Sequence, residues 1–232
     1  MLKKYLEQLK KVNPKAYAGV LVSIGAIGLG TQVTTTPEVP KEKVVAVSQQ
    51  LARPQSQRDN KYQPHRTCNT SANAMFLDFY RDLMPERPQL VDDDDYLDSV
   101  MKRGDTTYHE VQTAALKAWG LDTVWDDSGS RQKLIDLTSQ GYPTVVNILH
   151  RGVIGGKGAS ALRGGHMILI RYYDAEKQMF DVSDPYGSLS QGYPSGLGVA
   201  AGNYKISKES LFARWQGGSR RLSNNQKAAF KL

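Results

Sequence analysis

The chain has 232 residues, of which 40% are hydrophobic and 23% are charged. This length suits one well-cored domain with appendages and excludes two large domains, and a single cysteine excludes a disulfide within the chain. The net charge of +7 is concentrated at the ends: residues 1–15 carry +4 and residues 203–232 carry +6, which leaves −3 between them. Basic ends favour anionic surfaces such as a membrane, an anionic cell-wall polymer or nucleic acid, although they also serve solubility.

The N-terminus combines this basic stretch with an apolar run. Residues 16–30 (AYAGVLVSIGAIGLG) contain no charged side chain, and the run can be extended to residue 33. A basic stretch before an apolar run is typical of a signal peptide or an anchor, but about 20 apolar residues usually cross a bilayer and no clear A-x-A cleavage site follows. We therefore expect residues 16–33 to make the protein membrane-anchored or exported, in a virion or a host cell envelope. A non-membrane appendage is the alternative.

Composition also predicts the domain organisation. The stretch TTTPEVPKEK contains two prolines and alternating charge, which is typical of a linker. The expected segments are a basic segment (residues 1–15), an apolar anchor or signal-like segment (16–33), a linker (34–52), a folded domain (53–222) and a basic tail (223–232).

The folded domain begins with helical patterns and continues with strand patterns. Apolar residues at helical spacing and glycine stops predict the helices, and β-rich runs predict the strands. The predicted helices cover residues 69–83, 95–102, 107–119 and 131–140, and the predicted strands cover residues 143–149, 166–173 and 178–182. Helices followed by an antiparallel-type sheet indicate an α+β fold. Four acidic residues at 92–95 suit a helix N-terminus and lack the spacing of an EF-hand calcium loop.

Cys68 lies where a loop rich in Pro, His and Arg meets the first predicted helix. A helix N-terminus offers free N–H groups and a partial positive charge, which favour the thiolate over the thiol. Because the thiolate is the nucleophilic form, this position suits a catalytic cysteine. A lone cysteine is nevertheless more often a small core residue without reactivity.

A histidine and an aspartate occupy the ends of two predicted strands. His166 follows two glycines and opens one strand, and Asp184 follows the next strand in a Asp-Pro-Tyr-Gly turn. A hairpin-like loop at residues 174–177 would make the strands neighbours and bring the two side chains to one end of the sheet. The carboxylate could then accept a hydrogen bond from the imidazole and fix its tautomer. A structural histidine and a turn-forming aspartate are the plainer interpretations. We expect ordinary roles for His109 and His150. His65 is too close in sequence to Cys68 to be the first choice as the base.

A nucleophile on a helix, a base on a strand and an orienting acid one strand later have the order of a papain-like peptidase. Four segments also resemble the C39-like peptidases, relatives of the double-glycine leader peptidases, over about residues 54–215. These segments are residues 56–60 with 67–75, 141–146, 164–170 and 182–187. The resemblance implies a papain-like cysteine peptidase fold, with an N-terminal helical half whose nucleophile helix packs on an antiparallel sheet.

The resemblance also implies the roles of site residues. Cys68, His166 and Asp184 would form the catalytic triad. A glutamine upstream of the nucleophile helps to form the oxyanion hole in this family, and Gln57 matches it through its context. Gln63 is nearer to the cysteine and stays an alternative. No metal or other cofactor is expected.

The expected function is hydrolysis of a peptide bond in peptidoglycan or in a protein or peptide. The bacteriocin-processing members have a Cys-Gly pair and an ABC exporter, whereas Asn69 follows Cys68 here, so a leader-peptidase role is not expected. The basic termini would contact a membrane or an anionic cell-wall surface, and no specific nucleic-acid partner is expected. The alternatives are an inactive structural or particle-associated protein that keeps the fold, and a related amidase or transpeptidase.

Overall fold

An antiparallel sheet forms the centre of the protein in a computed structural model that describes residues 53–82, 90, 92–156, 163–187 and 202–230. Within these residues the sheet has six strands in the order β1-β6-β2-β3-β4-β5. The strands are β1 (Thr123–Asp126), β2 (Thr144–Arg151), β3 (Arg163–Asp174), β4 (Met179–Asp184), β5 (Gly202–Ser207) and β6 (Trp215–Leu222). All neighbouring pairs are antiparallel. The strand that comes last in the chain therefore lies inside the sheet, between β1 and β2.

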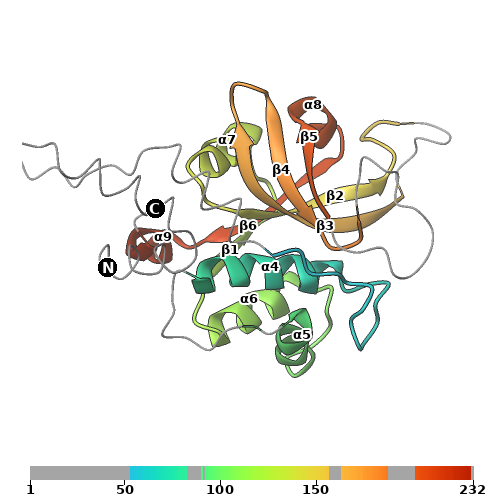
Figure 1. The fold of residues 1–232 in the computed structure, drawn as a ribbon, viewed down its shortest axis with the longest axis vertical. Helices are drawn as coiled ribbons and strands as arrows, with labels where there is room; N and C mark the ends of the chain where they lie inside the picture. Colours follow the sequence, from blue (N-terminus) through green and yellow to red (C-terminus); the bar gives the residue numbers. More distant parts are fainter. Residues whose placement is uncertain (1–52, 83–89, 91, 157–162, 188–201, 231–232) are drawn as a thin grey trace, which may run out of the picture. The chain divides into compact units, whose positions relative to one another are not determined.

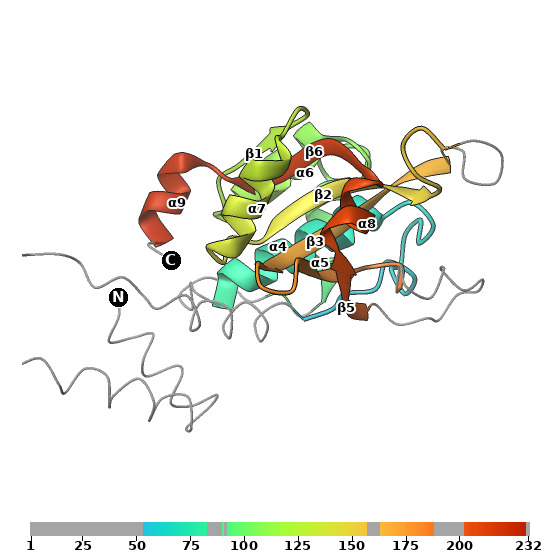
Figure 2. The ribbon, with the colours of Figure 1, turned by 90° about the horizontal axis from the view of Figure 1, so that it is seen from above.

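Helices cover both faces of this sheet (Figure 1). One face carries α4 (Cys68–Asp82), α5 (Asp93–Met101) and α6 (His109–Ala118), and the other carries α7 (Arg131–Ser139) and α8 (Lys208–Phe212). A further helix, α9 (Asn224–Phe230), follows β6. Figure 2 shows the same layers from above, with α4 running under the sheet.

The first of these helices, α4, is buried along most of its length. Its large side chains, among them Met75, Phe76 and Phe79, are at most 1% exposed and belong to one hydrophobic core. The sheet contributes Met167 and Leu169 of β3 to the same core. Burying each large apolar side chain contributes about 1.5–3 kcal/mol, so α4 is held firmly against β3. This packing fixes the position of the first residue of α4, which is Cys68.

The opposite face of the sheet has a core of its own. Ile168 and Ile170 alternate with the residues of β3 that face α4, and they pack with Leu134 of α7, Phe180 of β4 and Trp215 of β6. Successive side chains of a strand point to opposite faces, so β3 supplies both cores. A strand that is buried on both faces is a rigid support for its first residues, which include His166.

The predicted α+β, papain-like fold is confirmed. Each predicted helix and strand is present, with boundaries shifted by a few residues at most. The acidic residues at 92–95 lie at the start of α5, where the Asp92 side chain accepts a hydrogen bond from the backbone N–H of Asp94. We did not predict β1, β5, β6, α8 or α9. The reason is clearest for β6, because its sequence WQGGSRRL contains two glycines and does not alternate between apolar and polar residues.

The predicted membrane location is wrong. In the part of the chain that the structure describes, no helix is both long enough and apolar enough to cross a membrane. The longest helix there, α4, has 15 residues and would span about 22 Å, less than the about 30 Å of a hydrocarbon core. The segments on which the prediction was based, residues 1–15 and 16–33, lie outside the described residues, as does the linker at 34–52.

Candidate active site

Cys68 is the first residue of α4, as the loop-to-helix pattern predicted. The loop before it is tied to the helix by Asn60, whose side-chain amide contacts the hydroxyl groups of Thr67 at 2.9 Å and Ser71 at 3.0 Å. The Ser71 hydroxyl also hydrogen-bonds to Asp93 at the start of α5. These buried contacts set where α4 begins, and the helix has no acidic residue in its first turn. The partial positive charge of the helix N-terminus therefore acts on the Cys68 thiol without an acidic residue in the first turn of α4 itself to offset it.

His166 and Asp184 form a buried pair at one end of the sheet. His166 Nε2 lies 2.7 Å from Asp184 Oδ1, and the two side chains are 3% and 0% exposed. In the pairing of β3 with β4, Leu169 lies opposite Ser183, so Asp184 reaches the part of β3 next to His166. The structure thus brings together the histidine and the aspartate that the predicted hairpin placed at one end of the sheet.

Two further donors hold the Asp184 carboxylate in place. The backbone N–H of Tyr186 donates to Oδ1 at 2.8 Å, and the hydroxyl of Tyr204 on β5 donates to Oδ2 at 3.2 Å. With donors on both of its oxygens, the buried carboxylate keeps one orientation, and it can then fix the orientation of the His166 ring.

The electrostatics of Cys68 and His166 favour a thiolate beside an imidazolium. Burial raises the pKa of the Cys68 thiol, but the hydrogen bond and the charge of His166, together with backbone N–H groups of Met167 and Asn69, lower it by more, so the net shift is downward. Burial lowers the pKa of His166, but the charge and hydrogen bond of Asp184, followed by those of Cys68, raise it to about 10. The two shifts have opposite signs: Asp184 is the main group that raises the pKa of His166, and the charged ring in turn lowers the pKa of Cys68.

The structure distinguishes the two candidate glutamines. Gln57 is 1% exposed, its backbone N–H donates to the carbonyl of Pro185 at 2.9 Å, and its side-chain Nε2 donates to the carbonyl of Pro64 at 2.9 Å. Pro185 directly follows Asp184, so this hydrogen bond connects Gln57 to the residue next to the aspartate of the pair. Gln63 is exposed, and its side chain accepts a hydrogen bond from Arg66. Gln57 is therefore buried next to the turn that follows Asp184, whereas Gln63 lies at the surface.

Sequence reasoning missed His150, which borders the pair. Its ring centroid lies 5.6 Å from that of His166 and 5.2 Å from that of Tyr186. The pairing of β2 with β3 explains this, because Ile148 lies opposite His166 and His150 is two residues further on the same side of β2. The β2–β3 register, which the sequence did not supply, would have identified this neighbour. His109, in contrast, stacks on Trp125 with ring centroids 3.5 Å apart, and His65 is exposed in the loop before Cys68.

The comparisons with known proteins gave a family match and several similar solved structures. The family model described as Peptidase_C39 like family matches residues 49–211. The peptidase domain of Streptococcus ComA, a bi-functional ABC transporter involved in a quorum sensing pathway, is 18% identical with a TM-score of 0.43, and the match covers 68% of this chain and 91% of that one. A C39-like peptidase from Bacillus anthracis is 14% identical with a TM-score of 0.48, and the match covers 75% of this chain and 94% of that one.

A third solved structure is also similar. Digestive procathepsin L 3 of the Tenebrio molitor larval midgut is 13% identical with a TM-score of 0.43, and the match covers 93% of this chain and 90% of that one. A search of curated proteins gave no match. The family match spans well over half of the 232 residues, and the chain therefore belongs to the C39-like peptidase family.

Proposed function

We propose that this protein is a cysteine peptidase that hydrolyses peptide bonds with Cys68 as nucleophile, His166 as acid and base, and Asp184 as the orienting residue. The observation that carries the proposal is the buried 2.7 Å contact between His166 Nε2 and Asp184 Oδ1. The same His166 ring also interacts with the Cys68 thiol, and this interaction raises the pKa of His166. Family membership supports the same reaction class.

The contact at Nε2 leaves Nδ1 as the ring nitrogen that would act on the cysteine. Because Asp184 engages His166 Nε2, the Cys68 proton is received by Nδ1. The lowered pKa of Cys68 and the raised pKa of His166 both favour the proton on the ring before substrate binds, which supports this part of the proposal. The nucleophile is then a preformed thiolate, and the general acid is already protonated.

The reaction follows from this charge distribution. The thiolate of Cys68 attacks the peptide carbonyl carbon, forms a C–S bond and pushes the electron pair onto the carbonyl oxygen. His166 donates its Nδ1 proton to the leaving nitrogen as the C–N bond breaks. The ring, now neutral, accepts a proton from water, which attacks the thioester and releases the carboxylic product and the Cys68 sulfur.

Two donors can bind the negative oxygen of the tetrahedral intermediate. A side-chain amide carries two N–H donors, and the hydrogen bond to Pro64 uses only one of those of Gln57. The backbone N–H of Cys68 is at the start of α4, where N–H groups have no partner within the helix. We assign these two groups to the oxyanion hole.

The substrate class that we propose is a peptide, with peptidoglycan peptides and protein segments as the first candidates. Contact of the basic termini with an anionic surface stays a prediction, and it would raise the local concentration of enzyme on an anionic polymer.

Alkylation of the only cysteine tests the proposal without a substrate. Because the chain has one Cys, the intact mass after iodoacetamide treatment reports on Cys68 alone. We expect rapid alkylation at pH 5–6, which is well below the pKa of about 8.5 of an ordinary thiol. This low-pH reactivity should be lost in His166→Ala. Cleavage of a peptide mixture, with Cys68→Ala as the inactive control, then identifies the product.

Two results together would contradict the proposal. One is alkylation that rises only above pH 8 and is the same in His166→Ala, which would mean that the two side chains do not act as a pair. The other is the absence of any cleavage product that depends on Cys68. The protein would then be one that keeps the fold without turnover.

A further inference from the structure

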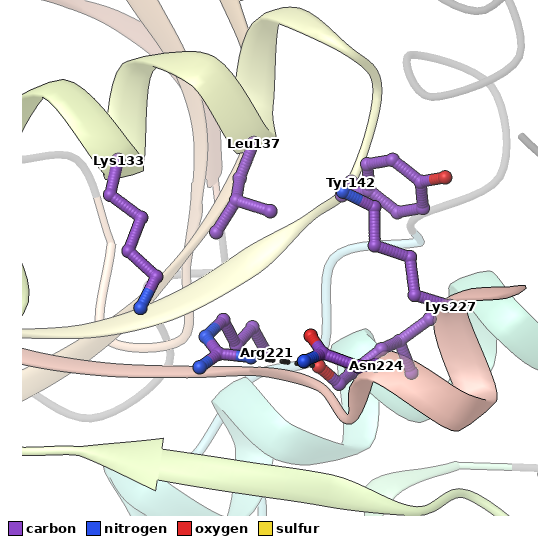
Figure 3. Close-up of a pocket in the computed structure, with 7 residues that line it drawn as sticks. Lys133, Leu137, Tyr142, Arg221, Asn224 and Lys227 are labelled. Atoms are coloured by element: carbon purple, nitrogen blue, oxygen red, sulfur yellow. Dashed lines mark hydrogen bonds between the residues drawn. The ribbon is translucent and has the colours of Figure 1, made fainter.

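A cationic pocket lies away from the active site, between α7, β6 and α9 (Figure 3). Its volume is about 310 Å³, and it is lined by Lys133 from α7, Arg221 from β6 and Lys227 from α9. On β6 the active-site end is marked by Trp215, which pairs with Ile148 on the strand beside His166. Arg221 is six residues further along, or about 20 Å at 3.3 Å per residue, so the pocket and the active site are separate.

The three cations of this pocket come together from different elements. Figure 3 shows the Lys133 side chain extending from α7 toward the strand that carries Arg221, while Lys227 extends from α9 toward Tyr142. The Lys227 amine lies 4.1 Å from the centre of the Tyr142 ring. Burial lowers the pKa of Lys227, and repulsion from Arg221 lowers it further. Positive charges therefore crowd one hollow, which is unfavourable unless an anion joins them.

Little negative charge balances these cations. Lys133 forms an ion pair with Asp126 at 3.3 Å, and no other carboxylate among the described residues is paired with the three cations. Arg221 Nε is buried and has no hydrogen-bond partner in the described part of the chain, and its Nη1 donates only to the carbonyl of Leu222, at 3.4 Å. Three cations against one carboxylate leave a formal charge of +2, with guanidinium donors still to be satisfied.

We propose that this pocket binds a phosphate group, either free or as the ester of a small organic molecule. A phosphate ester carries about −1.5 to −2 charges near neutral pH, which matches the excess charge of the pocket, whereas a carboxylate supplies only one charge. The planar guanidinium of Arg221 can donate to two phosphate oxygens, and the two lysines add point charges. Leu137 and the ring of Tyr142 line the same hollow and would contact the organic part of an ester.

Titration calorimetry on the full chain tests this proposal with glycerol 3-phosphate and inorganic phosphate as probes, and with glycerol and acetate as controls. We expect saturable binding of the phosphates that weakens as salt is added, because the contacts are ionic. Lys227→Gln and Lys133→Gln should each reduce the affinity about tenfold or more, since charged hydrogen bonds are lost. Lys117→Gln, which removes an exposed lysine of α6, should leave it unchanged.

The outcomes separate the ligand sources and the competing explanations. Tighter binding of glycerol 3-phosphate than of inorganic phosphate would identify an ester site, and equal binding would identify a site for the phosphate group alone. The proposal is overturned if neither phosphate saturates, if acetate binds equally well, or if Lys227→Gln and Lys133→Gln bind like the wild type. None of these readouts depends on Cys68, so they are independent of the peptidase proposal.

Discussion

Replacing Asp184 should uncouple His166 from the Cys68 thiol. Asp184 is fully buried, and its charge and hydrogen bond are the largest influences that raise the pKa of His166, whereas burial lowers it. Asp184→Ala removes these influences and leaves the burial, so the pKa of His166 should fall. With less positive charge on the ring, the pKa of Cys68 should rise, because His166 is the main group that lowers it.

The size of the effect follows from the shift itself. The pKa of His166 rises from its ordinary value of 6.5 to about 10. At 1.36 kcal/mol per pKa unit, this corresponds to about 5 kcal/mol in favour of the imidazolium. Loss of about 2 kcal/mol of this stabilisation would lower the equilibrium constant for forming the thiolate–imidazolium pair about 30-fold. The thiolate population falls by this full factor where the thiolate becomes the minor form, so we expect Asp184→Ala to alkylate at pH 6 up to about 30-fold more slowly than the wild type. Asp184→Asn keeps an acceptor without the charge and should lie between the two.

The assay is the rate of iodoacetamide alkylation between pH 5 and pH 9, followed by intact mass. Asp181→Asn is the matched control, because Asp181 is another buried carboxylate on β4 but pairs with Arg171 instead of His166. Thermal unfolding of each variant shows whether it is folded at the assay temperature. If folded Asp184→Ala kept the wild-type pH profile, the buried aspartate would not control the ring, and the coupling that we infer would be wrong.

Three other changes test separate parts of the structure. Gln57→Ala should lower kcat about 10²–10³-fold without changing the alkylation profile, whereas Gln63→Ala, at an exposed position, should have wild-type kcat; equal losses would remove Gln57 from the oxyanion hole. Burial raises the pKa of Asp93 from 3.8 to about 7, so the folded state retains a proton that the unfolded state has lost, and stability is lost as the pH rises from about 4 through about 7. The uncharged Asp93→Asn should avoid this loss, so its free energy of unfolding in urea should gain up to about 4 kcal/mol relative to the wild type between pH 4 and pH 8. A difference in the free energy of unfolding that does not change with pH would contradict the raised pKa of Asp93. Phe76→Ala should reduce the free energy of unfolding by about 3–5 kcal/mol, while Tyr62→Ala at a surface site should change it by less than about 0.5 kcal/mol.

The sequence alone determined features that depend on neighbouring residues. Helical spacing after Cys68 predicted α4, and the turn at residues 174–177 predicted that β3 and β4 are neighbours, which brings His166 and Asp184 to one end of the sheet. Such features follow from backbone geometry over a few residues, because side chains repeat every 3.6 residues in a helix and every two in a strand. This was enough to predict the α+β fold and to select the candidate triad, whose roles stay a proposal.

The tertiary structure decided everything that depends on distant segments. It inserted β6 between β1 and β2, placed His150 and Tyr186 beside the His166 ring, and buried Gln57 while leaving Gln63 exposed. None of these follows from local pattern, because the register of a strand and the burial of a loop are set by the partner against which each one packs.

The cationic pocket is the clearest case of this difference. Along the chain, Lys133, Arg221 and Lys227 are unremarkable members of a basic composition, and the last two lie in a region that composition marked only as basic. Packing of α7, β6 and α9 makes them line one hollow. The energy of charges depends on their separation in space and on the burial around them, and folding alone sets both.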